Sequence, residues 1–165
     1  MYKYVIAKSP NGYDIYVDLI TSSAGHCLSR QPYLINLIKE VLMPMHLKGP
    51  NVSIEYDMGR VIGNTEIVTT SDKDAIFYAK SKNQNSFSRF VKNRSMSPTS
   101  QLTIILERDG DNNYELSDTW IGQNSPPFPG DGKETKLSKS YWESHALVMD
   151  QQVIQSKTIT KVCPY

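Results

Sequence analysis

The sequence contains few of the motifs that mark common enzyme sites or membrane anchors. Its 165 residues hold no P-loop, no dinucleotide-binding fingerprint, no serine elbow and no metal-binding box. No apolar run approaches the roughly 18 residues that a membrane-spanning helix needs, and the N-terminal residues lack the long apolar core of a signal peptide. These absences exclude several enzyme classes, and we expect a cytoplasmic protein that does not associate with a membrane.

Cysteine is scarce, since the chain has only Cys27 and Cys163, near opposite ends of the sequence. No cysteine and histidine have the spacing of zinc ligands, because His26 is adjacent to Cys27 while His46 and His145 stand alone. Without an export signal we expect two free thiols, and a disulfide between them is the alternative. We also expect no metal and no other cofactor.

Positive charge is concentrated in one part of the chain. The whole protein has 18 lysines and arginines against 17 acidic residues, a net charge of +1. Residues 79–106 contain five cations and no acidic residue, so this segment alone has a net charge of +5. Concentrated cations near aromatic residues and a histidine favour a polyanionic partner such as RNA. The ordinary alternative is a solvated basic face beside a hydrophobic core.

Hydrophobic periodicity predicts an α+β fold. Residues 2–8 and 13–20 alternate like strands around Asn11-Gly12, a strong hairpin signal, and the apolar residues between positions 34 and 42 form the stripe of an amphipathic helix. The pattern also predicts strands at 52–56, 60–69, 87–94, 102–107, 114–121 and 154–162, and short helices at 75–80 and 141–148. We expect a single domain over residues 1–165, with one curved antiparallel sheet, the N-terminal amphipathic helix packed on it and short additional helices.

A proline-rich loop is expected at residues 125–135, which contain three of the nine prolines. Phe128 lies between Pro127 and Pro129, and we expect its ring to pack inward and to pin the loop against the sheet, which would place Trp120 and His145 near one another. The alternative is a solvated loop whose aromatic residue awaits a partner, which would make this segment a protein-interaction surface.

The absence of a metal motif leaves metal-independent acid/base chemistry on a phosphodiester as the catalytic option. RNA suits such chemistry because its 2′-hydroxyl is a built-in nucleophile, so the enzyme needs a base, an acid and cations for the developing charge. His145, one helical turn beyond Tyr141 on the predicted helix, is the candidate proton donor or acceptor. The ordinary alternative is a histidine that bonds a backbone carbonyl.

Two cations near the centre of the basic segment are the candidate phosphate ligands. Lys92 and Arg94 are two residues apart on a predicted strand, so both point to one face, whereas Arg89 points to the other. Two cations on one strand face can hold one phosphate, although such cations often simply face water.

Three more residues are candidates by their type and position. Arg60 and Glu66 are six residues apart on a predicted strand and share a face, where a plain salt bridge between them is the alternative. Trp120 is large enough to stack on a base, although tryptophan in a small domain is usually a core residue.

Several short strings resemble a small family of bacterial and prophage-borne proteins that belongs with the barnase/EndoU/colicin/RelE-like (BECR) ribonuclease superfamily. The resemblance spans roughly residues 57–148. It rests on seven strings: YDMGRVIG at 56–63, YAK at 78–80, RFVKNR at 89–94, LTIIL at 102–106, WIG at 120–122, PPFPGD at 126–131 and WESHALV at 142–148.

The resemblance implies a helix packed on a four- or five-stranded antiparallel sheet, with metal-independent RNA cleavage on the open sheet face. The implied catalytic residues are His145, Lys92, Arg94, Thr103 and Glu66, and the implied nucleic-acid-binding residues are Arg60, Arg89, Lys80 and Trp120. The chain departs from the pattern of many such nucleases because it has no histidine on its predicted first helix, so the second acid/base group is not assigned.

The sequence therefore predicts a metal-independent endoribonuclease-like protein of prophage or toxin type. RNA is the expected partner, and an acidic neutralising protein is a further candidate partner. Two alternatives remain open: a non-catalytic nucleic-acid-binding module in which the same cations hold phosphate, and a protein-interaction module that uses the proline-rich loop.

Overall fold

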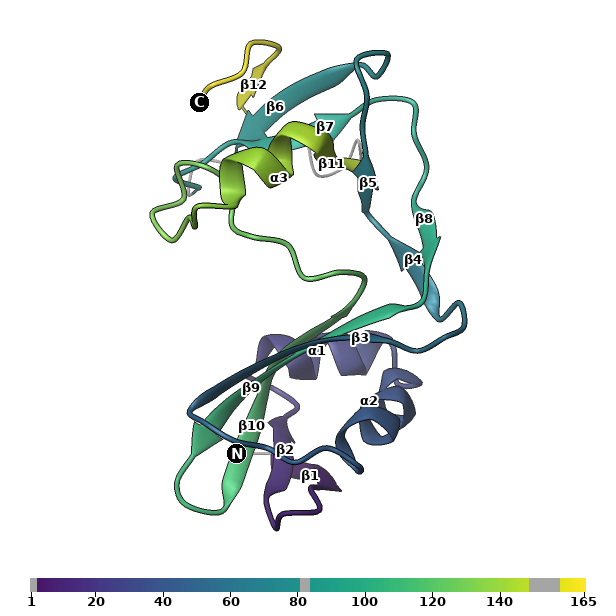
Figure 1. The fold of residues 1–165 in the computed structure, drawn as a ribbon, viewed down its shortest axis with the longest axis vertical. Helices are drawn as coiled ribbons and strands as arrows, with labels where there is room; N and C mark the ends of the chain where they lie inside the picture. The colour runs from purple at the N-terminus through teal and green to yellow at the C-terminus, as the bar shows by residue number, and fades with distance from the viewer. Residues whose placement is uncertain (1–2, 81–83, 149–157) are drawn as a thin grey trace. The chain divides into compact units, whose positions relative to one another are not determined.

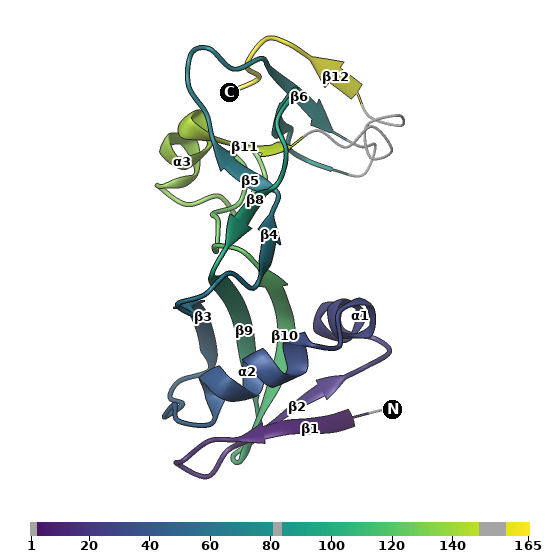
Figure 2. The same cartoon turned by 90° about the vertical axis from the view of Figure 1, so that its right-hand side faces the viewer.

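The chain is an α+β protein that is mostly β. Its structure, a computed structural model, describes residues 3–80, 84–148 and 158–165, in which three helices and twelve strands are found. The chain forms two compact units (Figures 1 and 2): the first consists of Met1–Ile62 and Ser100–Gln123, and the second of Gly63–Thr99 and Asn124–Tyr165. The expectation of a single domain over residues 1–165 stays a prediction.

The first unit contains a five-stranded sheet with the strand order β1-β2-β10-β9-β3. Its strands are β1 (Lys3–Lys8), β2 (Asp14–Asp18), β3 (Asn51–Asp57), β9 (Gln101–Asp109) and β10 (Asn113–Ile121). The hairpin of β1 and β2 confirms the Asn11-Gly12 turn signal, and Gly12 adopts the left-handed φ of 91° that such a turn favours.

Two helices pack against this sheet. The predicted amphipathic helix is confirmed as α2 (Leu34–Leu42), which buries Leu34, Ile38 and Leu42 in the main hydrophobic core. A second helix, α1 (Ser23–Arg30), was not predicted; Ser22 caps it by accepting a hydrogen bond of 2.8 Å from the backbone N–H of Gly25. None of the helices in the described residues is long and apolar enough to cross a membrane.

The second unit contains another five-stranded sheet, with the strand order β12-β6-β7-β11-β5. Its strands are β5 (Ile67–Thr69), β6 (Ile76–Lys80), β7 (Ser88–Val91), β11 (His145–Val148) and β12 (Thr158–Thr160). A small two-stranded sheet of β4 (Gly63–Thr65) and β8 (Ser97–Thr99) and the helix α3 (Ser138–Ser144) complete this unit.

The prediction of one antiparallel sheet is wrong. In the first unit β10 lies parallel to β2, and in the second β11 lies parallel to β7, so both five-stranded sheets are mixed. These parallel pairs join segments that are far apart in the sequence, which a rule that pairs consecutive strands does not anticipate.

The two predicted short helices are also corrected by the structure. Residues 76–80 form strand β6. Ser71 and Asp74 have a spacing that resembles a helix cap, but they close a turn, in which the Asp74 N–H donates to the Ser71 carbonyl. The helix expected at 141–148 lies earlier, as α3, and His145 begins β11 with extended backbone angles. The strand predicted at 60–69 divides at Glu66, and residues 154–157 of the last predicted strand lie outside the described residues.

Candidate functional site

His145 lies at the junction of α3 and β11, in the second unit. Its ring stacks on Tyr141, one helical turn earlier, with 4.0 Å between ring centroids and an interplanar angle of 3°. Its Nδ1 lies 2.9 Å from the Tyr141 carbonyl oxygen and 3.0 Å from the Ser144 hydroxyl oxygen. When Nδ1 carries the proton and donates to the carbonyl, Nε2 is the basic nitrogen. The contact fits both interpretations of His145, as a base and as a carbonyl-bonded structural histidine.

Arg89 supports the backbone at this junction. It lies in β7 and is only 9% exposed. Its Nη1 donates to the Thr70 hydroxyl at 2.8 Å and to the carbonyl oxygen of His145 at 2.9 Å. The guanidinium therefore holds the main chain of the residue whose imidazole is the candidate base.

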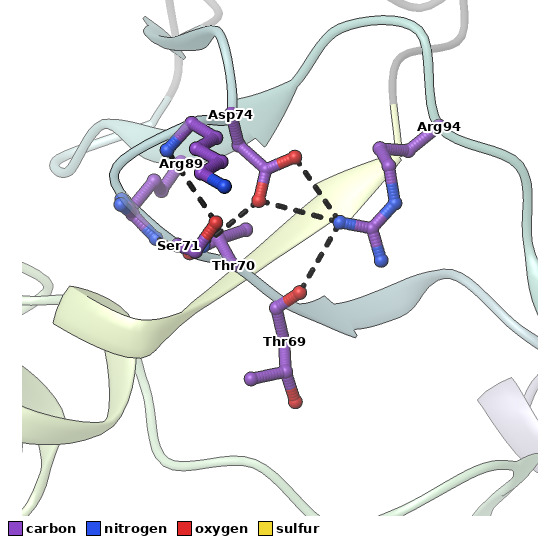
Figure 3. A network of polar contacts seen from close by, with 7 residues as sticks. Thr69, Thr70, Ser71, Asp74, Arg89 and Arg94 are labelled. Carbon is purple, nitrogen blue, oxygen red and sulfur yellow. Dashed lines mark hydrogen bonds and ion pairs between the residues drawn. The ribbon is translucent and has the colours of Figure 1, made fainter.

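Arg94 contacts the backbone of β5, the strand that pairs with β11 at His145. Its Nη1 lies 3.2 Å from an Asp74 carboxylate oxygen and 3.3 Å from the carbonyl oxygen of Thr69, to which it donates (Figure 3). Thr69 is the direct strand partner of His145 in the β5–β11 pair. We call His145, Thr69, Thr70, Asp74, Arg89 and Arg94 the histidine–arginine cluster.

Asp74 is the anionic member of this cluster. The backbone N–H of Ser71 donates to its carboxylate at 2.8 Å, and this contact, with a further contribution from Arg94, lowers the pKa of the Asp74 carboxyl. Because the carboxylate stays charged, it offsets part of the positive charge of Arg94. Arg94 keeps partial exposure, with 37% of its side chain accessible.

The prediction that Lys92 and Arg94 share one strand face is wrong. Strand β7 ends at Val91, and Asn93 takes a left-handed φ of 61°, which breaks the alternation of side chains. In the parallel register Val148 pairs with Val91. Lys92 therefore follows the end of β7 that is far from His145. The backbone positions of His145 and Lys92 are four residue steps apart in this register, about 13 Å along the strand direction.

The other predicted cation and acid of this unit, Lys80 and Glu66, contact residues outside the cluster. Lys80 ends β6, and its ammonium lies 5.0 Å from the centroid of the Phe87 ring, while that of Lys92 lies 5.5 Å from the ring of Phe77. Glu66 is exposed at the bend between β4 and β5, where its carbonyl accepts from the Val148 N–H. The structure therefore groups His145 with Arg89 and Arg94, and places Glu66 and Lys92 at the other end of β11.

The remaining three predicted residues belong to the first unit. Thr103 is fully buried in β9, and its hydroxyl donates to the Gly122 carbonyl at 2.9 Å. Trp120 lies half-buried in β10 and donates from Nε1 to the Gln123 carbonyl at 3.0 Å. The hydroxyl of Thr103 therefore makes a structural hydrogen bond to the residue that follows the end of β10.

Arg60 does not pair with Glu66. Its guanidinium forms an ion pair of 2.9 Å with Glu40 of α2, and both side chains are more than half exposed. The expected strand begins only at Gly63, because Gly59 adopts a left-handed φ of 72° and the residues after it are irregular. The shared strand face proposed for Arg60 and Glu66 is therefore wrong.

The inward packing of Phe128 is confirmed in part, because the half-buried ring packs on helix α3, whereas the sheet was the expected support. Its ring stacks on Trp142 with 3.9 Å between centroids, and Trp142 donates from Nε1 to the Pro126 carbonyl at 2.9 Å. Trp142 also contacts the ring of Tyr141 edge-on at 5.1 Å. A continuous series of ring contacts thus runs from the proline-rich loop through α3 to His145.

Sequence reasoning missed Thr70, Asp74, Tyr78 and Tyr165 as neighbours of the predicted residues. Tyr78 pairs with Arg89 across β6 and β7, and the ring of Tyr165 meets that of Tyr78 edge-on at 5.7 Å. Tyr78 directly precedes the basic segment of residues 79–106, which is a signal that could have drawn attention to it. The positions of Thr70 and Asp74 follow from tertiary contacts alone.

The two units differ in net charge. The second unit contains eleven lysines and arginines against seven acidic residues, a net charge of +4, whereas the first has seven against ten, a net charge of −3. The nearly neutral chain is therefore composed of a basic and an acidic unit, and the histidine–arginine cluster belongs to the basic one.

Cys27 and Cys163 are both free thiols. Within the described ranges there is no group of three or more histidine, cysteine or acidic side chains placed to hold a metal ion. Comparison of the chain with known protein families, curated proteins and solved structures found no match in any of the three. The ribonuclease resemblance consequently stays a hypothesis that rests on the sequence strings.

Proposed function

We propose that the chain is a metal-independent endoribonuclease-like protein whose basic unit binds RNA and whose His145 acts as the general base. One observation carries this proposal: Arg89 donates to the His145 carbonyl, and Arg94 donates to the carbonyl of Thr69, which is the strand partner of His145. A candidate base and two cations from separate segments therefore meet at one strand end. Cations beside a base are what phosphoryl transfer from RNA needs.

In the proposed reaction the His145 Nε2 takes the proton of a ribose 2′-hydroxyl. The bond from O2′ to phosphorus forms, the bond from phosphorus to O5′ breaks, and O5′ takes a proton from water. The hydroxide left behind then takes the proton from the His145 imidazolium, which restores the base and the water. The products are a 2′,3′-cyclic phosphate and a 5′-hydroxyl end. Arg94 would offset the charge that develops on the phosphoryl oxygens, and Arg89 acts as a positioning residue through the His145 carbonyl.

Product chemistry tests this function directly. We expect the wild-type chain to cut a fluorogenic RNA of mixed sequence in the presence of EDTA, leaving 2′,3′-cyclic phosphate ends, because the nucleophile belongs to the substrate. The same sequence with 2′-deoxyribose throughout should remain intact. Ends are identified by mass spectrometry. Cleavage of the deoxy substrate, or no cleavage of any RNA in a mixed pool, contradicts the proposal.

A second candidate function is a non-catalytic nucleic-acid-binding module. The second unit has a net charge of +4, and such a charge supports phosphate binding by itself. Binding of RNA without cleavage in the preceding experiment would favour this function. The protein-interaction alternative has weaker support, because Phe128 is stacked on Trp142. An acidic neutralising protein remains a proposed partner that would cover the basic unit.

Removal of two cations should weaken the salt dependence of RNA binding. Lys80 and Lys92 each place an ammonium over an aromatic ring in the basic unit, and each phosphate contact on a single strand contributes about 0.7 to the slope of log K against log salt. We expect the Lys80→Ala, Lys92→Ala double variant to lower this slope by about 1.4. Binding is measured by fluorescence anisotropy with 2′-O-methyl RNA.

The matched control for this experiment is the double variant Lys8→Ala, Lys48→Ala, which removes two exposed cations from the acidic first unit. Its slope should equal that of the wild type, although both double variants lose the same charge. Equal slopes in all three proteins would mean that Lys80 and Lys92 do not contact phosphate.

A further inference from the structure

Arg89 is an unusual residue because its charge is buried without a carboxylate partner. Only 9% of the residue is exposed, and no described carboxylate lies in ion-pair contact with it. Its Nη1 donates to two neutral groups, the Thr70 hydroxyl and the His145 carbonyl, and Arg89 also forms a hydrogen bond with the Tyr78 side chain, which is neutral as well. A buried guanidinium is normally paired with an anion, since its desolvation is otherwise not offset.

Two buried side-chain polar atoms have no hydrogen-bond partner in the described part of the chain, and both can donate. They are Arg89 Nε and the hydroxyl of Tyr165. Buried donors are rarely left unpaired in folded proteins, so such a pair needs an explanation. The complementary group is an acceptor with negative charge.

The surroundings connect these two donors. Arg89 is the direct strand partner of Tyr78, whose ring contacts that of Tyr165. Arg89 is also near enough to act on both phenols: burial is the main cause that raises the pKa of Tyr78 and of Tyr165, and the guanidinium opposes the rise in each. The three side chains thus share one positively charged, aromatic environment.

We propose that Arg89 and Tyr165 form a binding site for a phosphate group, which accepts hydrogen bonds from Arg89 Nε and the Tyr165 hydroxyl. A phosphate supplies both the negative charge and the several acceptor oxygens that the two donors require. The site extends the proposed function, but it stands whether or not the chain cleaves RNA. Both donors are covered, so the proposal includes an outward shift of residues 161–165, of which the first four are exposed.

Inorganic phosphate tests the site without any RNA. We expect a saturable rise of the melting temperature of the full chain when phosphate replaces chloride at constant ionic strength and pH, because a ligand that binds the folded state stabilises it. The fitted Kd should increase at least tenfold in Arg89→Lys, which keeps the charge but loses Nε, and about tenfold in Tyr165→Phe, which loses one hydrogen bond to a charged group.

Lys73→Ala is the matched control, since it removes an exposed cation of the same unit and should keep the wild-type Kd. If Arg89→Lys does not fold, Tyr165→Phe decides, because it removes a single hydroxyl and leaves the ring on Tyr78. The absence of a saturable rise in the wild type, or a wild-type Kd in Tyr165→Phe, overturns the proposal.

A competition experiment identifies the source of the phosphate group. Saturating 2′-O-methyl RNA that raises the apparent Kd for inorganic phosphate would show that the site takes a phosphate of the nucleic acid. An unchanged Kd would show that it takes a separate phosphate-bearing molecule. Both results support a phosphate site, and neither depends on RNA cleavage, so failure of the proposed nuclease function is recognised separately.

Discussion

Replacement of His145 by alanine is expected to lower RNA cleavage by about 10²–10⁴-fold, the range that removal of a general base typically costs. The reason is the orientation of the ring, whose Nδ1 is held by the Tyr141 carbonyl and whose face rests on the Tyr141 ring. This arrangement presents Nε2 as the basic nitrogen. Initial rates on a fluorogenic RNA under single-turnover conditions measure the loss.

The control variant is His46→Ala, which removes an exposed histidine of the first unit and should cleave at the wild-type rate. Because a lost fold would imitate a lost base, the melting temperature of His145→Ala must be measured as well. We also expect His145→Asn, whose amide can still donate to the Tyr141 carbonyl, to be stable and inactive. A folded His145→Ala protein that cleaves at the normal rate removes His145 from the mechanism.

Elements whose determinants are close in sequence could be predicted. The β1–β2 hairpin follows from Asn11-Gly12 and the alternation around it, and α2 follows from an apolar stripe that directly contacts the core. In contrast, α1 buries the small residues Ala24 and Gly25 and only one large one, Leu28, so its stripe is too weak to recognise. A Cβ at Gly25 would collide with the Asp18 carbonyl oxygen, so α1 packs closely against the backbone at Asp18. A hydrophobic pattern in the sequence does not reveal such a contact.

The candidate site could be predicted in residue type but not in pairing. His145, Arg89 and Arg94 were selected because a histidine and concentrated cations suit phosphate chemistry, and the structure places them in one cluster. The partners of Arg60 and Arg94 are Glu40 and Asp74, each 20 residues away in sequence. Local periodicity carries no information about such contacts, since they depend on how strands and loops are assembled.

The end of β7 shows how a single backbone angle changes a predicted site. The alternation that would place Lys92 and Arg94 on one face requires extended backbone through residue 94, but Asn93 has a positive φ. Asparagine tolerates this conformation better than most residues. The same turn lets Arg94 reach Thr69 and Asp74, so the residue lost from the predicted phosphate pair joins His145 instead.

Replacement of Trp142 by alanine is expected to destabilise the second unit by about 3–5 kcal/mol, the usual cost of deleting a buried tryptophan. Trp142 is 1% exposed, and it joins the proline-rich loop to α3: Phe128 stacks on its ring, Pro126 accepts from its Nε1, and Tyr141 of the same helix makes a T-shaped ring contact with it. Urea unfolding, followed by circular dichroism, measures the change in free energy. Because Tyr141 carries the ring of His145, cleavage should fall together with stability.

The variant Trp142→Phe separates packing from hydrogen bonding in this residue. It keeps an aromatic ring against Phe128 but leaves the Pro126 carbonyl without its donor, so we expect a loss of about 1–3 kcal/mol. Phe128→Ala, which removes the other ring of the stack, should lose less when Trp142 is already alanine, by about 0.5–1.5 kcal/mol of coupling. A loss below about 0.5 kcal/mol in Trp142→Ala would mean that the loop at 125–135 is held by other contacts, and that Phe128 is available as an interaction surface.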